Sequence, residues 1–332
     1  MPNALPHPCT RKRYRYLLGA AVLALILLGS CETVALDPAV PFESPDASLT
    51  RLPQPGEALT FLVLGDWGDR GTALQRTVAA QMGAVAARTA AAFVATAGDN
   101  FYPDGVASAA DAHWQKSFER VYAAPSLRVP WHPVLGNHDY AGRIDAQLAY
   151  TARSDRWRFP ARYYALTYPI DDTTRLRLLM IDTVPLAALE EATPAGAEAR
   201  RQLRWIDSTL AAPAPRWTVV VGHHPVYSAG EHGDNDVLRR SLQPLLERHG
   251  VAAYVSGHDH DLQHLRHDGF HQFVSGAGAK VRETNSHPLT LFASTRPGFL
   301  VVSATRQRLR FQFVDHEGNL LYGAALEPGA RK

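Results

Sequence analysis

Short apolar runs alternate with longer stretches of helical spacing along most of the chain. Five of these runs, at residues 60–64, 91–95, 129–135, 217–221 and 251–255, each lead into a glycine. Short apolar runs bounded by glycine predict buried β-strands. Helical patterns lie between several of the runs, and strands that alternate with helices are typical of an α/β fold. We therefore predict an α/β domain.

The remaining elements follow from the same periodicities. Helical spacing predicts helices over residues 72–88, 109–122, 198–210 and 237–248. Further strands are predicted over residues 163–168 and 175–181, as a pair, and over 272–274, 299–302 and 309–314. At 332 residues the chain is long enough to bury a sizeable core.

A residue type that can bind a metal ion stands beside each of the five glycines. These residues are Asp66, Asp99, Asn137, His223 and His258. In α/β sheets, ligands gather outside the carboxyl ends of the strands. A glycine at the strand end lets the backbone turn sharply, so that the next side chain can point into a shared site. We expect the five side chains to lie close together.

The first thirty residues have the pattern of an export signal. Four basic residues at positions 11–15 precede an apolar run, residues 17–28, that is too short to span a bilayer. The run leads into Gly29-Ser30-Cys31, which with Leu28 resembles the lipobox of bacterial lipoproteins, where the cysteine is acylated. We predict a signal peptide over residues 1–30 and a protein lipid-anchored at Cys31 in the bacterial periplasm or cell envelope. An ordinary cleaved signal and a retained membrane anchor are the alternatives.

Residues 31–58 hold several prolines among polar residues, which predicts an extended tether before a single domain over residues 59–325. The chain has 34 basic and 32 acidic residues, and four of the bases lie in the first thirty positions. Without that segment the protein is slightly acidic, which argues against nucleic-acid binding by bulk charge. Because Cys9 leaves with the signal and Cys31 takes the lipid, we expect no disulfide. We also expect a monomer.

The segment from Gly98 to Tyr102 carries the most specific chemistry. A carboxylate, Asp99, comes after a predicted strand, and the phenol of Tyr102 follows three residues later. The carboxylate can bridge two cations and the phenol can bind as phenolate. Because a phenol loses its proton only near pH 10, ligation at neutral pH needs a strongly acidic cation such as ferric iron. Taken alone, the segment is better explained as a turn with a packed tyrosine, so the other ligands must come from elsewhere.

A tetrahedral zinc ion takes four donors, and the chain offers more than four. The seven donors are Asp66, Asp99, Tyr102, Asn137, His223, His258 and His260. Two octahedral-leaning ions that share Asp99 fit this set better and leave positions open for water or substrate. In an extended segment, His258 and His260 would face one side and reach one site. By itself, that segment fits a polar surface loop equally well.

Five blocks of the sequence resemble those of the purple acid phosphatases, within the calcineurin-like metallophosphoesterases. The blocks are Gly65-Asp66-Trp67-Gly68, Gly98 to Tyr102, Gly136 to Asp139, Gly222-His223 and Gly257 to His260. The small tartrate-resistant acid phosphatases are the most similar members, and the similarity covers roughly residues 59–322. The resemblance implies two sheets packed face to face with helices outside, a four-layer α/β/β/α arrangement, with the metals at the strand ends.

The resemblance also implies a role for each donor. Asp66, Tyr102 and His260 would hold a ferric ion (Fe3+), with Asp99 as the bridge to a second ion. Asn137, His223 and His258 would hold that ion, which is divalent iron, zinc or manganese (Fe2+, Zn2+ or Mn2+). His138 and His232 would stand beside the substrate phosphate as hydrogen-bond donors and candidate general acids. Considered alone, His138 could instead support the side chain of Asn137 without contacting the substrate. We assign His224 no ligand role.

The implied function is the hydrolysis of phosphate monoesters by an acid phosphatase. Two metal ions about 3.5–4 Å apart are the standard device for displacement at phosphorus, with a metal-bound hydroxide as nucleophile. The expected partners are small phosphorylated substrates outside the cytoplasm. A phosphodiesterase or nucleotidase on the same scaffold is one alternative, and a non-hydrolytic iron-binding redox protein is another. The sequence has no nucleotide-binding glycine-rich loop, zincin motif or nucleophile-elbow serine.

Overall fold

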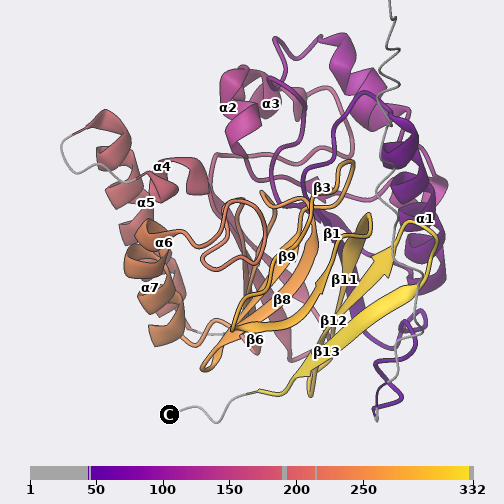
Figure 1. The fold of residues 1–332 in the computed structure, drawn as a ribbon, viewed down its shortest axis with the longest axis vertical. Coiled ribbons are helices and arrows are strands. Elements are labelled where there is room, and N and C mark those ends of the chain that lie inside the picture. The colour runs from indigo at the N-terminus through magenta and orange to yellow at the C-terminus, as the bar shows by residue number, and fades with distance from the viewer. Residues whose placement is uncertain (1–43, 45, 189–192, 214, 329–332) are drawn as a thin grey trace, which may run out of the picture. The chain divides into compact units, whose positions relative to one another are not determined.

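Two mixed β-sheets organise the part of the chain that the structure, a computed structural model, describes: residues 44, 46–188, 193–213 and 215–328 (Figure 1). The first sheet has the strand order β13-β12-β11-β1-β2-β3. Its strands are β1 (Leu59–Leu64), β2 (Val94–Thr96), β3 (Trp131–His132), β11 (Gly298–Ala304), β12 (Leu309–Asp315) and β13 (Leu320–Leu326). Within it, β1, β2 and β3 run parallel, so their carboxyl ends share one edge.

The second sheet has the order β10-β8-β9-β7-β6-β5-β4. Its strands are β4 (Tyr164–Pro169), β5 (Arg175–Met180), β6 (Trp217–Val221), β7 (Ala253–Ser256), β8 (Leu262–His267), β9 (Phe270–Ser275) and β10 (Thr290–Ser294). Its centre, from β5 through β6 and β7 to β9, is parallel. The residues that follow β6 and β7 therefore emerge at one edge of this sheet.

Helices cover the outer faces of the two sheets (Figure 1). They are α1 (Ala73–Thr89), α2 (Asn137–Ala141), α3 (Ile144–Tyr150), α4 (Thr183–Ala187), α5 (Pro194–Ala211), α6 (Asp236–Ser241) and α7 (Gln243–Arg248), with a π-helical turn η1 (Trp114–Glu119) and a 3-10 turn η2 (Pro125–Leu127). Helix α1 packs on the first sheet, and α4 to α7 pack on the second. The predicted α/β class and its four-layer arrangement are confirmed.

Period-two alternation along the strands divides the core into two apolar clusters. On β5, Leu178 belongs to the cluster between the sheets, whereas its neighbour Leu179 belongs to the cluster under helices α4 to α7. Between the sheets, Phe273 of β9 stacks on Phe311 of β12 with ring centroids 4.1 Å apart. At its centre the second sheet is buried on both faces, and all five residues of β6, which is mostly apolar, are buried.

Most predicted elements are present within a few residues of their expected bounds, and the exceptions have physical causes. The helix expected over residues 109–122 is reduced to the short turn η1. The helix expected over residues 237–248 is interrupted at Leu242, because α7 begins with a proline in its first turn. Strands β8, β10 and β13 and the short helices α2, α3 and α4 were not predicted. In β8 the buried Gln263 and His264 interrupt the apolar pattern.

The predicted signal, Cys31 and most of the predicted tether lie outside the described residues. The final part of the tether lies against β12, where Gln312 Nε2 donates to the carbonyl oxygens of Leu49 and Arg51 at 3.0 and 2.9 Å. Arg308 forms an ion pair with Asp46 at 2.8 Å. None of the helices in the described ranges has both the length and the apolar composition needed to cross a membrane.

Candidate metal centre

The side chains expected beside the five glycines meet at the carboxyl ends of the parallel strands of both sheets. Asp66 follows β1 and Asp99 follows β2, whereas Asn137 opens α2 shortly after β3. From the second sheet, His223 follows β6 and His258 follows β7. These side chains, together with Tyr102 and His260, form one cluster with donors from both layers of the sandwich, and we call the place where they meet the crevice.

Three of the donors form one half of the crevice, which we call the tyrosine half: Asp66, Tyr102 and His260. The Tyr102 hydroxyl lies 2.9 Å from Asp66 Oδ1 and 3.0 Å from His260 Nε2. His260 Nε2 lies 3.5 Å from Asp66 Oδ1. Three different segments thus converge on one point with two oxygen donors and one nitrogen donor.

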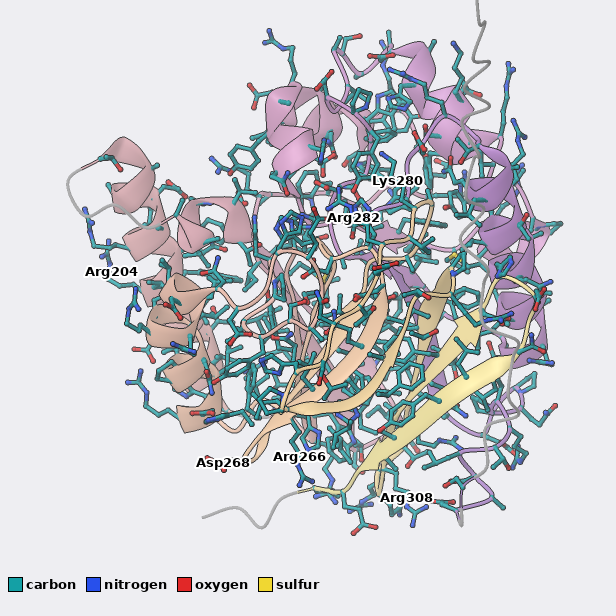
Figure 2. All side chains as sticks on the ribbon, viewed as in Figure 1. Arg204, Arg266, Asp268, Lys280, Arg282 and Arg308 are labelled. Atoms are coloured by element: carbon teal, nitrogen blue, oxygen red, sulfur yellow. The ribbon has the colours of Figure 1, made fainter. Side chains whose placement is uncertain are left out.

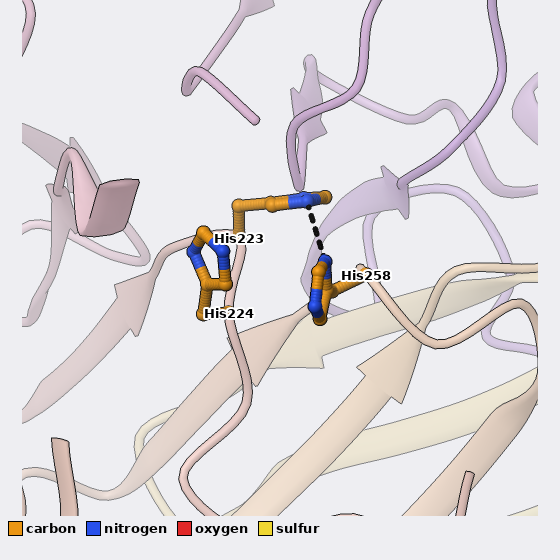
Figure 3. Close-up of side chains that lie close together, drawn as sticks. All are labelled: His223, His224 and His258. Carbon is orange, nitrogen blue, oxygen red and sulfur yellow. Dashed lines mark hydrogen bonds between the residues drawn. The ribbon is translucent and has the colours of Figure 1, made fainter. Parts of the chain in front are cut away.

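Three more donors form the asparagine half: Asn137, His223 and His258. Asn137 Oδ1 lies 3.0 Å from His223 Nε2 and 3.1 Å from His258 Nδ1. The two imidazole nitrogens are 3.2 Å apart, as the dashed line in Figure 3 marks. His223 Nδ1 lies 2.9 Å from the carbonyl oxygen of Ala97, to which it can only donate. In the neutral ring, the lone pair is therefore on Nε2.

The lone pairs of the asparagine half are the best test of whether a cation fits. An amide oxygen and the lone pair of His223 Nε2 face each other at 3.0 Å, and His258 Nδ1 faces both. Oxygen and imidazole donors of this kind are those that bind iron, zinc and manganese. A cation at this point would satisfy all three atoms, so the residues fit a metal ion.

Asp99 stands between the two halves. Its Oδ2 lies 2.9 Å from the Tyr102 hydroxyl, and its Oδ1 lies 3.5 Å from His223 Nε2. The backbone N–H of His138 donates to Oδ1 at 2.9 Å and holds the carboxylate in place. Each oxygen therefore faces one half of the crevice, which is the placement that a shared ligand needs.

Burial shifts the titration of several groups away from their charged forms. Burial, with the nearby charge of Asp99, raises the pKa of Asp66. Burial and the carboxylates of Asp66 and Asp99 raise the pKa of the Tyr102 phenol well above its usual value. Burial lowers the pKa of His260 to about 4, with Arg282 and Lys280 acting in the same direction. The imidazole is thus neutral and able to bind a metal, whereas the phenol would ionise only against a strong cation.

At the strand ends, three of the candidate metal donors, as well as a glycine, adopt the left-handed backbone conformation of a sharp turn. Asp66, Asp99 and His258 adopt left-handed backbone conformations, with φ of 58°, 48° and 73°. Such conformations cost non-glycine residues on the order of 1–3 kcal/mol each and gather at functional sites. Of the adjacent glycines, Gly98 also has a positive φ, of 86°. A Cβ on Gly98 would lie 2.6 Å from His223 Nδ1, so this glycine also makes room for a ligand.

His258 and His260 both reach the metal centre, as expected, but not as residues of an extended segment. The positive φ of His258 breaks the extended conformation. As a result, His258 joins the asparagine half and His260 the tyrosine half, with the buried Asp259 turned away between them. Asp259 accepts a hydrogen bond from the His232 backbone at 3.0 Å and one from the Ser228 hydroxyl.

The rim of the crevice carries histidines and positive charge. His138 donates from Nδ1 to the carbonyl oxygen of Pro103, which leaves its Nε2 3.9 Å from Asp99 Oδ2. His232 stacks on His258 with centroids 4.1 Å apart, and its Nε2 lies 3.1 Å from Arg282 Nη1. Lys280 Nζ lies 3.7 Å from the centroid of the Tyr102 ring. An anionic substrate would meet favourable charge at this rim.

Several supporting residues were missed by the sequence analysis although they lie within the blocks of resemblance. Asp139 accepts from the backbone N–H of Gly136 at 2.9 Å and of Asn100 at 3.0 Å, which ties two of the ligand loops together. The Asn100 side chain donates to the carbonyl of Val134 at 2.7 Å. Their position beside Asp99 and Asn137 in the sequence was the available signal.

His224 lies beside the asparagine half, as Figure 3 shows. Its Nδ1 lies 3.1 Å from the hydroxyl of Thr183, which anchors the ring. The ring of His224 is tilted against that of His258, with centroids 4.5 Å apart. Thr183 Oγ1 already accepts from the backbone N–H groups of His223 and His224 at 3.1 and 2.9 Å, so its hydroxyl donates to His224 Nδ1. In the neutral ring Nε2 is then an N–H donor at the wall of the crevice.

Comparison with known proteins shows to which family the chain belongs. Residues 59–262 match the model of the calcineurin-like phosphoesterases. The chain belongs to this family. Tartrate-resistant acid phosphatase type 5 of Sus scrofa is 36% identical over 303 residues, which cover 83% of this chain and 89% of the relative. Purple acid phosphatase 17 of Arabidopsis thaliana is 34% identical over 301 residues, 83% of this chain and 88% of the relative.

Solved structures with a similar fold superpose on most of the described chain. GAP50, described as the anchor in the inner membrane complex of Plasmodium, superposes with a TM-score of 0.76 at 26% identity, over 82% of this chain and 90% of that one. The purple acid phosphatase PPD1 of yellow lupin has a TM-score of 0.62 at 16% identity, over 83% of this chain and 55% of that one, and supports the fold alone.

Proposed function

We propose that the two halves of the crevice hold two metal ions and that these serve the hydrolysis of phosphate monoesters. The enzyme class follows from the family and from relatives at 34–36% identity over most of the chain. The chain is an acid phosphatase, a phosphoric monoester hydrolase with a binuclear metal centre. The assignment of ligands and of metals is our proposal.

The donors support a different ion in each half. The tyrosine half would hold ferric iron, because only a strongly acidic cation can keep Tyr102 ionised against burial and two carboxylates. The asparagine half would hold a divalent ion of iron, zinc or manganese, because it combines a neutral oxygen with two imidazoles. Asp99 would supply one oxygen to each ion.

When bound, a pair of cations supplies an activated water and neutralises charge on the phosphoryl oxygens. The chain's own residues do the rest. With Nδ1–H held by Pro103, a protonated His138 presents Nε2–H to the crevice and can donate it to the leaving oxygen. His232, stacked on His258 and held by Arg282, borders the same opening and can donate a hydrogen bond to the phosphate from Nδ1. Lys280 adds positive charge beside Tyr102.

The convergence of seven donors from both sheets, with Asp99 between them, is the observation that carries this proposal. It is tested by metal analysis, a visible spectrum and hydrolysis assays on one purified sample. We expect two metal ions per chain, at least one of them iron, a pink to purple colour and release of phosphate from an aryl monophosphate. Cleavage of phosphodiesters without cleavage of the monoester would favour the phosphodiesterase alternative. Coloured protein that cleaves no phosphoester would favour the redox alternative.

We also propose that the protein is exported and held on a bacterial membrane by a lipid on Cys31. The support is the basic cluster, the apolar run and the cysteine that follows it. Replacement of the cysteine by Cys31→Ser should move the protein from the membrane fraction to the soluble fraction of the cell envelope. If the variant stays with the membrane, a retained hydrophobic segment anchors the chain instead.

A further inference from the structure

A hollow of about 440 Å³ lies at the end of the sandwich opposite the metal centre. We call it the arginine hollow, because four of the residues that line it are Arg175, Arg177, Arg216 and Arg306. Arg175 and Arg216 stand at the amino ends of β5 and β6, whereas His223 follows the carboxyl end of β6. Five strand residues, about 17 Å of chain, separate the two ends of β6. The hollow is therefore distinct from the metal centre.

Three of the four guanidinium groups are held by carbonyl oxygens. Arg177 donates to the carbonyls of Thr209 and Pro213 at 2.9 and 2.8 Å. Arg175 donates to the carbonyl of Asp171 at 2.7 Å, and Arg216 donates to that of Arg306 at 2.8 Å. Carbonyls orient an arginine but leave its positive charge in place. Each of the anchored groups keeps further N–H donors for a ligand.

No described carboxylate neutralises this cluster. Within the described ranges, none of the four arginines forms an ion pair, whereas others such as Arg156 and Arg162 do so with Glu119 and Asp182. The acid closest in sequence, Asp171, accepts hydrogen bonds from the backbone N–H groups of Thr173 and Thr174. Burial, without a neighbouring acid, lowers the pKa of Arg177. Four like charges around one hollow repel each other unless an anion binds between them.

We propose that the arginine hollow is a second anion site, which binds a group with clustered phosphate charges. Guanidinium groups are the preferred partners of phosphate oxygens, because their planar N–H forks bind two oxygens at once. The positive charge of four guanidinium groups is more than a single monovalent anion can neutralise. The ligand is therefore either a soluble polyanion or the phosphate groups of an anionic lipid surface.

The first described residues of the tether lie beside this end of the molecule. Arg306 and Arg308 lie in the turn between β11 and β12, and Arg308 pairs with Asp46, among the first described residues of the tether. Figure 2 shows Arg308 at one end of the sheets and Lys280 and Arg282, which rim the metal centre, at the other. The described part of the chain thus begins beside the turn that contributes Arg306 to the hollow.

The test compares two double variants of the full-length protein that lose the same charge. R175Q/R306Q removes half of the cluster, and R204Q/R266Q removes two exposed arginines elsewhere on the second sheet and its helices (Figure 2). Binding is measured by calorimetry with inositol hexakissulfate, which offers clustered anionic groups without a phosphate ester. Co-sedimentation is measured with phosphatidylcholine vesicles, with and without about one third phosphatidylglycerol. Hydrolysis of an aryl monophosphate reports on folding and should be unchanged in both variants.

We expect R175Q/R306Q to weaken binding at least about tenfold in one of the two assays, and R204Q/R266Q to leave it within about twofold. Loss of calorimetric binding assigns a soluble polyanion. Loss of the phosphatidylglycerol-dependent part of sedimentation assigns the lipid surface, because the anchor acts equally on both kinds of vesicle. Equal weakening by both variants would mean bulk charge alone and would overturn the proposal. Unchanged binding in R175Q/R306Q would overturn it as well.

Discussion

The two halves of the metal centre offer different kinds of donor at nearly equal distances. In the tyrosine half, a carboxylate and a phenol meet one imidazole. In the asparagine half, an uncharged amide oxygen meets two imidazoles. Leaving the shared Asp99 aside, the first half carries one negative charge, or two when Tyr102 is ionised, and the second carries none.

This difference teaches how one crevice can hold two unlike ions. A cation of higher charge gains more from the negative half, because the attraction scales with the product of the charges and is strong away from water. Imidazole and neutral oxygen donors suit a divalent ion. On the proposed assignment, the charge of the donors, rather than the spacing between them, would separate the two metal sites.

Asp99→Asn should have the largest effect, because it weakens the one ligand that both halves share. We expect loss of both ions and a fall in monoesterase activity of more than about 10³-fold, beyond the usual cost of removing one preorganised group. Metal analysis of the purified variant checks this. Asp207→Asn, at a half-exposed aspartate that pairs with His249, is the matched control. Full occupancy by two metals in Asp99→Asn would contradict a shared carboxylate.

Single histidine replacements should empty the two halves separately. His260→Ala should remove the iron and the colour, and His258→Ala should remove a colourless ion and keep the colour. Each should lower activity by about 10²–10³-fold. Metal analysis with a visible spectrum distinguishes the two variants. His249→Ala, at the end of helix α7 and bonded to Asp207, should resemble the wild type. Identical metal losses in both variants would end the distinction between the halves.

Tyr102→Phe should change the spectrum more than the rate. The band from phenolate-to-iron charge transfer should disappear, because no other phenol lies in the crevice among the described residues. Activity should fall by about tenfold, equivalent to 1.4 kcal/mol, since Asp66, Asp99 and His260 remain to hold the ion. Tyr164→Phe is the matched control: Tyr164 is buried, but its hydroxyl donates to the Pro133 carbonyl. A coloured Tyr102→Phe protein would exclude the phenol as a ligand.

Removal of the metals should destabilise the protein by an amount that depends on pH. Burial raises the pKa of Asp66 above that of the unfolded chain, near 3.9. In metal-free protein the stability linked to Asp66 is therefore complete below about pH 3.9 and is lost as the pH rises through the raised pKa. We expect chelation to lower the thermal midpoint by roughly 5–15 °C, and by a few degrees more at pH 8 than at pH 5. Calorimetric scans at both pH values check the sign.

Much of the centre could be predicted because its donors sit at strand ends that local pattern reveals. Asp66, Asp99 and His223 follow apolar runs and glycines, and the rule that ligands gather at the carboxyl ends of parallel strands brought them together. Lys280 and Arg282 could not be predicted in the same way. They follow β9 on a loop whose position depends on the pairing of β9 with β7 and β8. No local sequence pattern distinguishes a basic loop residue that lies beside a metal centre from one that lies elsewhere on the surface.

By itself, the sequence determined the α/β alternation, the ligand blocks and the order in which they occur, because apolar periodicity and the choice of donor are local properties of the chain. Only the tertiary structure decided that Asp66, Asp99 and His258 take left-handed conformations, and that Arg175 and Arg306 share one hollow. These features depend on contacts between distant segments, such as the bond from the His258 backbone to Asp66, 192 residues away. No local pattern encodes which distant partner a side chain will meet.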